Sequence, residues 1–207
     1  MRGLMTVMAL MMLLVGSGCD AVQDTALPAD EQPAPAGAAD DYAVWSAVLA
    51  EWYPPGTGVQ TILLADHTDS MPLDADEVEL PAYFRGQLPD LAPATWRDYR
   101  QRRTTAVPLQ ADRFDRQLPG APVCLIGDAE LRELFAAPRG WETLHARYPR
   151  SSGIVALSLP GYNENRTEAL LSFSSTMGPL AGSGHLVMLA RRPGGWQVVA
   201  RAKTWIS

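Results

Sequence analysis

The chain has 207 residues, of which 47% are hydrophobic and 19% charged, so it can form one folded domain with additional segments. Residues 20–84 contain thirteen acidic residues and no Lys or Arg, whereas residues 85–207 contain ten acidic and sixteen basic residues. The basic residues are dispersed among Asp and Glu, which argues against a nucleic-acid partner and favours a solvated surface that also complements the acidic half.

The first eighteen residues have the layout of a secretory signal. Arg2 lies in a short charged start, an apolar run extends from Leu4 to Val15, and small residues continue to Gly18. The apolar run is too short for a membrane-spanning helix. We therefore assign residues 1–18 to a signal peptide.

The sequence Gly16-Ser17-Gly18-Cys19 resembles a bacterial lipobox, with Gly16 standing where Leu is usual. In that class of signals the peptide is cleaved just before the Cys, whose thiol and new amino group are acylated. The resemblance implies a lipoprotein that faces the periplasm and is held to a membrane of the cell envelope through Cys19. Several acyl chains make such attachment durable. An ordinary signal with an incidental Cys is the alternative, and Asp20 leaves the choice between inner and outer membrane open.

Residues 19–40 combine the Cys with a segment rich in Ala, Pro, Asp and Gln that contains no aromatic residue. Such a composition cannot bury enough apolar area to offset its ordering entropy, so we predict a disordered tether. A single globular domain is expected over residues 41–207. Its first helix is expected to be capped by Asp40 or Asp41 and to run to about Tyr53, because apolar residues recur every four positions from Val44 to Trp52.

A cluster of polar residues follows the β-branched and apolar segment Val59–Ala65, which we predict to be a strand. Asp66, His67 and Asp69 come directly after it. Two carboxylates around a His can bind a metal ion or supply acid–base chemistry. The alternative, which we favour, is a turn in which the side chains bond to the local backbone.

Short helices and strands are expected between residues 94 and 148. Arg97, Arg100 and Arg102 are expected to be solvated rather than to form an anion site. Cys124 lies in the middle of an apolar run and is expected to be buried and inert. The helices are predicted at Ala94–Arg103, Asp128–Ala137 and Trp141–Tyr148, and the strands at Val107–Phe114 and Pro122–Ile126.

The last quarter of the chain reads as four strands with short connections, which predicts an antiparallel meander. His185–Arg191 is apolar on both faces, which is typical of a central strand. The upstream helices are expected to cover one face of the sheet, so the fold class is α+β. The four strands are predicted at Ile154–Leu159, Glu168–Ser175, His185–Arg191 and Trp196–Ile206, with Trp196, Val198, Ala200 and Ala202 of the last one facing the core.

Gly182-Ser183-Gly184-His185 is the strongest chemical candidate in this sheet. Ser183 and His185 lie two positions apart, so their side chains share one face of a regular strand. Such a pair can activate a nucleophile when an acid orients the imidazole, but no acidic partner can be assigned from the sequence. The alternative is a hairpin whose glycines adopt positive φ.

Six short segments of the last third form an ordered series: Leu157-Ser158, Tyr162-Asn163, Arg166–Leu170, Gly182–His185, Gly195–Val199 and Trp205–Ser207. This series resembles the C-terminal region of a group of uncharacterised bacterial secreted proteins and lipoproteins. Many members of that group carry a Cys pair in the second hairpin, where Met177–Gly182 stands here. The group brings no known activity, so the resemblance implies location and architecture only.

These observations favour a non-catalytic binding or envelope-maintenance domain without a cofactor. Its partners would be the membrane, through the lipid anchor, and an envelope protein or a small molecule. The enzyme alternative is a periplasmic hydrolase that uses Ser183 and His185, or a metal-dependent site near Asp66, His67 and Asp69.

Overall fold

The computed structural model of the protein describes residues 38–70, 79–114, 118, 120–136 and 138–207. The chain divides into two units, Met1–Glu31 and Gln32–Ser207, and all described residues belong to the second unit. The predicted signal peptide, Cys19 and the tether up to residue 37 therefore lie outside the described residues. None of the helices in the described part is both long and apolar enough to cross a membrane.

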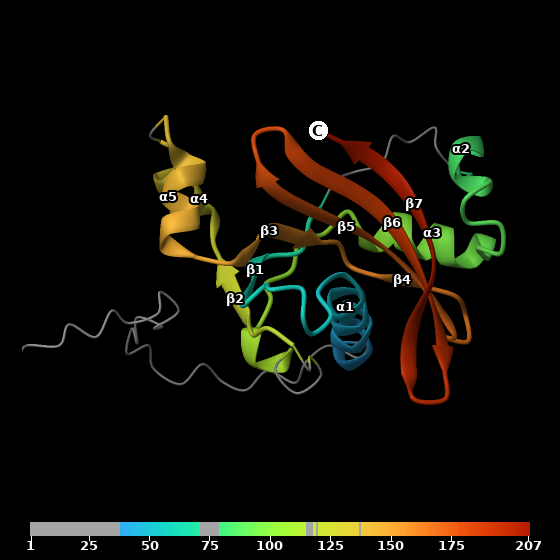
Figure 1. The fold of residues 1–207 in the computed structure, drawn as a ribbon. Coiled ribbons are helices and arrows are strands. Elements are labelled where there is room, and N and C mark those ends of the chain that lie inside the picture. Colours follow the sequence, from blue (N-terminus) through green and yellow to red (C-terminus); the bar gives the residue numbers. More distant parts are fainter. Residues whose placement is uncertain (1–37, 71–78, 115–117, 119, 137) are drawn as a thin grey trace, which may run out of the picture. The chain divides into compact units, whose positions relative to one another are not determined.

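Helices and strands are mixed in the first part of this unit, and strands dominate the second part (Figure 1). The helices are α1 (Ala38–Trp52), α2 (Ala82–Arg85), α3 (Pro93–Arg102), a short 3-10 helix (Ala111–Arg113), α4 (Asp128–Phe135) and α5 (Gly140–Arg147). The strands are β1 (Thr61–Ala65), β2 (Val123–Ile126), β3 (Ser151–Leu157), β4 (Gly161–Tyr162), β5 (Glu168–Gly178), β6 (Ala181–Arg192) and β7 (Gly195–Ile206).

All seven of these strands belong to one sheet within the described residues, in the order β2-β1-β3-β5-β6-β7, with β4 also pairing with β5. The strands from β3 through β5 and β6 to β7 are antiparallel, so the predicted α+β class and the C-terminal meander are confirmed. β1 pairs in parallel with both β2 and β3, which extends the meander into a mixed sheet. The central position predicted for His185–Arg191 is also confirmed, because β6 lies between β5 and β7.

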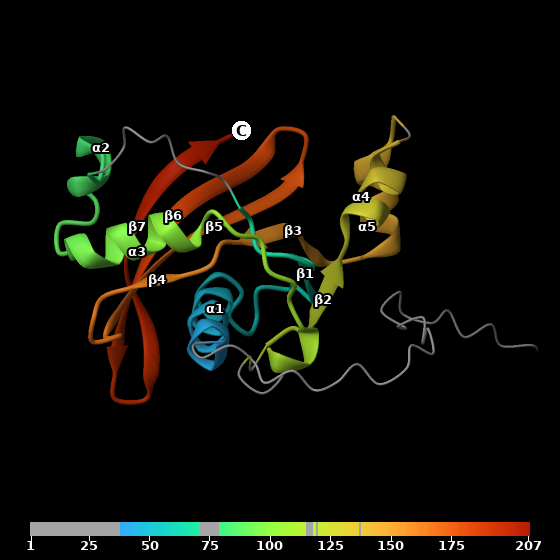
Figure 2. The same cartoon turned by 180° about the vertical axis from the view of Figure 1, so that it is seen from behind.

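Helices cover both faces of the sheet, so the expectation that they cover one face needs correction. On β5, Leu171 packs into the cluster that contains α1, and its neighbour Leu170 packs into the cluster that contains α3. Figure 2 shows α3 in front of the strands, with α2 beside its N-terminal end. Consecutive apolar residues on β5 and β6 require cover on both sides, because successive side chains point to opposite faces.

A third apolar cluster joins α4 and α5 to the parallel part of the sheet. Leu134 of α4 and Leu144 of α5 pack with Leu63 of β1 and Ile126 of β2. Because Ile62 and Leu64 point into the α1 cluster, β1 is also buried on both faces. The helices predicted around these positions are confirmed.

Strand β7 does not present one continuous apolar row. Its pairing with β6 shifts between Met188 and Leu189, where Ala200 and Val198 are the respective partners, so β7 carries one extra residue there. A bulge of this kind reverses the alternation of side chains along a strand. As a result Trp196 and Val198 pack in the α1 cluster, and Ala200 and Ala202 pack in the α3 cluster.

Two local predictions need correction. The first helix begins at Ala38, so Asp40 and Asp41 lie in its first turn rather than at its cap. The segment Val107–Phe114 is not a strand: it forms a single bridge at Pro108 and then the 3-10 helix Ala111–Arg113.

Helix α3 begins with Pro93, and its start is held by the Glu168 carboxylate of β5. Ala92 N donates to this carboxylate at 2.9 Å and Thr95 Oγ1 donates to it at 2.5 Å.

Candidate functional site

Ser183 and His185 lie on β6 and are brought together, as the sequence predicts. His185 Nε2 is 3.3 Å from Ser183 Oγ, and the imidazole ring is 5.7 Å from the Trp52 ring of α1. Burial, and then the positive charges of Arg201 and Lys203, lower the pKa of His185 below its ordinary value of 6.5. No carboxylate in the described part of the chain hydrogen-bonds to this imidazole. The pair therefore lacks the acid that orients the base of a catalytic triad.

The glycines on either side of Ser183 have a packing role. β5 and β6 do form a hairpin, and Gly182 and Gly184 lie at the start of β6, as the alternative interpretation has it. Neither glycine has positive φ, so that part of the interpretation is wrong. A Cβ at Gly184 would lie 2.1 Å from Trp205 Nε1, and one at Gly182 would lie 3.0 Å from Trp205 Cζ3. The two glycines leave room for the Trp205 indole on the surface of the sheet.

Asp66, His67 and Asp69 lie where the sequence predicts, directly after β1. His67 Nδ1 is 2.8 Å from Asp66 Oδ1, and both side chains are exposed. The backbone then diverges: His67 forms a bridge with Pro108, and Asp69 forms one with Ser158. Within the residues that the structure describes, no group of three or more His, Cys, Asp or Glu is placed to hold a metal ion.

Cys124 and His145 both occupy structural positions. Cys124 is half-buried against the α4–α5 cluster, so the expectation that it is buried is wrong. His145 is exposed, and its Nε2 lies 3.0 Å from the Met177 carbonyl oxygen.

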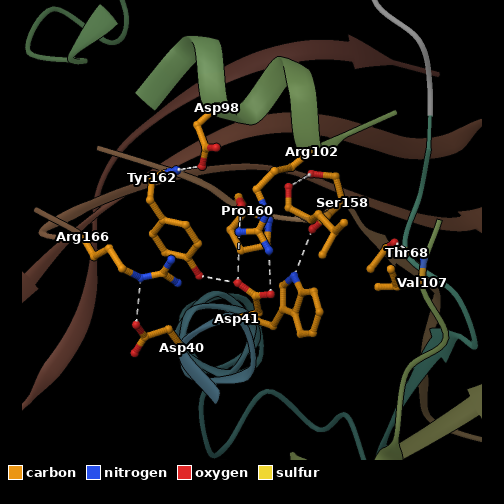
Figure 3. Close-up of polar contacts among 12 residues, drawn as sticks. Asp40, Asp41, Thr68, Asp98, Arg102, Val107, Ser158, Pro160, Tyr162 and Arg166 are labelled. Atoms are coloured by element: carbon orange, nitrogen blue, oxygen red, sulfur yellow. Dashed lines mark hydrogen bonds and ion pairs between the residues drawn. The ribbon is translucent and has the colours of Figure 1, made fainter. Parts of the chain in front are cut away.

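A buried polar network that the sequence analysis did not identify joins α1, α3 and β4 (Figure 3). Arg102 donates from Nη2 to Asp41 Oδ2 at 2.8 Å and from Nη1 to Oδ1 at 3.2 Å. The Tyr162 hydroxyl donates to the same carboxylate at 2.7 Å, and Arg102 Nη1 also donates to the Pro160 carbonyl. Burial and the neighbouring Asp41 charge raise the pKa of Tyr162. The Asp41 side chain is only 6% exposed and that of Arg102 25%, so Arg102 is not the solvated residue predicted.

A more exposed second layer surrounds this network. Arg166 Nε is 3.1 Å from Asp40 Oδ2, and its guanidinium lies 4.0 Å from the centre of the Tyr162 ring. Arg191 Nη1 is 3.7 Å from the other Asp40 oxygen. These contacts neutralise the charges of the first turn of α1, so the network is a structural clamp rather than an open binding site.

Three cavities in the described part of the chain lie along α3. Of the two larger ones, the larger cavity, of about 690 Å³, lies between α2 and α3, and the other, of about 520 Å³, lies between α3 and the segment around β4. Arg97 lines all three. The walls of the larger cavity are mainly apolar and include Leu80, Leu88, Pro89, Leu91, Pro93 and Trp96.

The two Arg side chains at the larger cavity differ in their contacts. Arg85 donates from Nη2 to Glu79 at 2.8 Å and from Nε to the Leu80 carbonyl at 2.7 Å. Arg97 is exposed and forms no hydrogen bond or ion pair within the described residues. Sequence periodicity could not indicate this cavity, because its walls come from the residues just before α2, from α2 and α3, and from the segment between them.

Comparison of the chain with protein-family models, with curated proteins and with solved structures finds no match.

Proposed function

We propose that this chain is a lipoprotein of the bacterial cell envelope whose folded domain binds a small-molecule ligand without catalysing a reaction. The signal-like leader and the lipobox-like sequence ending in Cys19 support attachment to a membrane, with the domain facing the periplasm. The group of secreted proteins and lipoproteins that the C-terminal segments resemble is consistent with this location.

The cavity between α2 and α3 is the observation that carries the proposal. Its volume of about 690 Å³ lies within the roughly 300–1,000 Å³ of ligand sites in proteins. It also has the usual composition of such a site, with mainly apolar walls and a charged group, Arg97, that has no protein partner within the described residues. A binding role follows from these features without any reacting group.

The Ser183–His185 contact is the one observation that favours the hydrolase alternative. A hydrolase of this type requires a base that is oriented by an acid and a site where the substrate carbonyl can meet oxyanion donors. His185 has Arg201 and Lys203 as its charged neighbours rather than a carboxylate. Both charges disfavour the imidazolium that forms during catalysis, so we favour binding over hydrolysis.

Recovery of the ligand from native envelope tests the proposal. The tagged whole chain is purified from its own bacterium, and the small molecules that accompany it are compared with those that accompany Leu91→Trp. We expect a compound that accompanies the wild type and is depleted at least about tenfold in Leu91→Trp, because the indole fills the half-buried wall of the cavity.

Leu180→Trp is the matched control, because Leu180 is 85% exposed and does not line this cavity. It should retain the compound at the wild-type level, and circular dichroism should show that all three proteins are equally folded. An equal yield of every compound from the wild type and Leu91→Trp would contradict a binding role for the cavity.

A further inference from the structure

We propose that the cavity between α2 and α3 takes the single alkyl chain of an anionic amphiphile, whose charged group is bound by Arg97. This inference rests on the proposed binding function and names the chemical class of the ligand. A fatty acid and a single-chain phospholipid both have this chemistry, which is one alkyl chain and one anionic group.

The walls of the cavity match an alkyl chain. Leu80 precedes α2, Leu88 and Leu91 lie between α2 and α3, and Pro93 and Trp96 belong to the first turns of α3. Leu88 and Trp96 are only 1% and 4% exposed, so the inner wall continues into the apolar cluster between α3 and the sheet. Each methylene group that is buried against such a wall lowers the free energy of binding, and the wall offers few hydrogen-bonding groups to a polar ligand.

The charges at the cavity favour an anion. Arg85 is already bound to Glu79 and to a backbone carbonyl, so its charge is compensated within the protein. Arg97 has no such partner within the described residues and lines the cavity from α3. A carboxylate or phosphate at the end of a buried alkyl chain can therefore pair with Arg97 without displacing a protein contact.

The space beyond Arg97 suits a polar headgroup. The same side chain lines the cavity of about 520 Å³ on the other side of α3, whose polar lining consists of Gln101, Tyr162, Asn163 and Arg166 together with the acidic Asp98 and Glu164. Asp98 already accepts a hydrogen bond from Tyr162 N. Arg97 also lines a smaller cavity of about 280 Å³ with Arg100, Gln101 and Thr104. Arg97 thus lies where a mainly apolar cavity meets polar ones, which is the position that the charged group of an amphiphile requires.

The test uses the whole chain with the substitution Cys19→Ser, so that no detergent is required. Isothermal titration calorimetry measures its affinity for decanoate, dodecanoate and dodecanol, each below its aggregation concentration. We expect dodecanoate to bind roughly fifteenfold more tightly than decanoate, since each buried methylene contributes roughly fourfold. Dodecanol should bind at least about tenfold more weakly than dodecanoate, because it lacks the charge. Dodecyl phosphate serves as the second anionic probe and distinguishes a phosphate headgroup from a carboxylate.

Variants separate the role of the charge from that of the apolar wall. Arg97→Gln should weaken dodecanoate binding about tenfold and leave dodecanol binding unchanged. Arg192→Gln, a change of the same kind at another exposed Arg, should alter neither. Leu91→Trp should abolish the binding of every probe.

Equal affinities of wild type and Arg97→Gln for both anionic probes would overturn the inference, as would dodecanol binding as tightly as dodecanoate. If none of the probes binds while a different compound accompanies the wild type and is lost in Leu91→Trp, the amphiphile inference fails and the binding function stands. If probes bind and no compound from the envelope depends on Leu91, the ligand class is correct and the proposed native function fails.

Discussion

Asp40 and Asp41 are neighbours in the chain but have different surroundings in the fold. Asp41 is almost fully buried and accepts hydrogen bonds from Arg102 and Tyr162, whereas the Asp40 side chain is 29% exposed and pairs with Arg166 and Arg191 at the surface. Two consecutive Asp residues before an apolar helix are typical of an N-terminal cap, so the sequence could not separate these roles.

Removal of the buried carboxylate should destabilise the protein far more than removal of its neighbour. Asp41→Ala leaves the Arg102 guanidinium half-buried and without its ion pair, so we expect a loss of about 3 kcal/mol in the free energy of unfolding. Asp40→Ala should cost at most about 1 kcal/mol, as is usual for exposed pairs. Urea denaturation of the whole chain measures both values, and similar losses for the two variants would contradict the assigned roles.

His185 illustrates the limit of a residue-level motif. The spacing in Ser183-Gly184-His185 correctly predicted that the two side chains share a face, because successive side chains on a strand alternate. Whether an acid orients the imidazole depends on the residues that the neighbouring strands bring beside it. β7, which pairs with β6, contributes the positive charges of Arg201 and Lys203.

At the scale of elements, α3 approaches β4 very closely. A Cβ at Gly161 would lie 2.0 Å from Tyr99 N and 2.2 Å from Tyr99 Cα, both of which are backbone atoms of α3. Tyr162 N also donates to Asp98 of α3 at 2.7 Å. Only a residue without a side chain permits this contact, which places α3 over the sheet and thereby forms the cavities along it.

Gly161→Ala should therefore disrupt the packing of α3. Because backbone atoms cannot move aside as a flexible side chain can, we expect a loss of about 3 kcal/mol in the free energy of unfolding. Gly86→Ala is the matched control, since no atom lies within 4 Å of its Cβ position and its φ is −69°. Thermal and urea denaturation compare the two variants, and equal stability would show that α3 does not approach β4 in this way.

Strand β7 shows why a correct strand prediction can still misplace side chains. Its alternating apolar residues predicted one core-facing row, but the bulge opposite Met188 and Leu189 divides that row between two clusters. A bulge depends on the register with the neighbouring strand, and register is a property of the pair rather than of either sequence.

At the scale of the whole molecule, the acidic and Arg-rich halves of the sequence meet in the fold. Asp40 and Asp41 of the acidic half pair with Arg102, Arg166 and Arg191 of the other half. The prediction that the basic residues complement the acidic half is confirmed for these contacts. The charge asymmetry is therefore partly an internal feature of the domain.

Attachment to the membrane is expected to depend on one thiol. The whole chain should be recovered with the membrane fraction, and Cys19→Ser should release it, because the acyl chains carry the anchoring. Cys124→Ser is the matched control and should remain with the membrane, since Cys124 lies on β2 of the folded domain. Membrane fractionation and the mass of the N-terminal peptide check this prediction, and an unacylated Cys19 or unchanged fractionation would refute it.

Local sequence patterns by themselves determined most helices and strands, the C-terminal meander and the central position of His185–Arg191. They could do so because hydrophobic periodicity is a property of residues that are close together in the sequence. Only the tertiary structure decided the parallel pairing of β1 with β2 and β3, the cover on both faces and the burial of Asp41. The pairings, the cover and the burial depend on contacts between segments that are distant in the sequence, and no local pattern specifies which segments will meet. The tertiary structure also decided the cavity beside Arg97, because residues 79–97 leave this space only when α3 is held over the sheet.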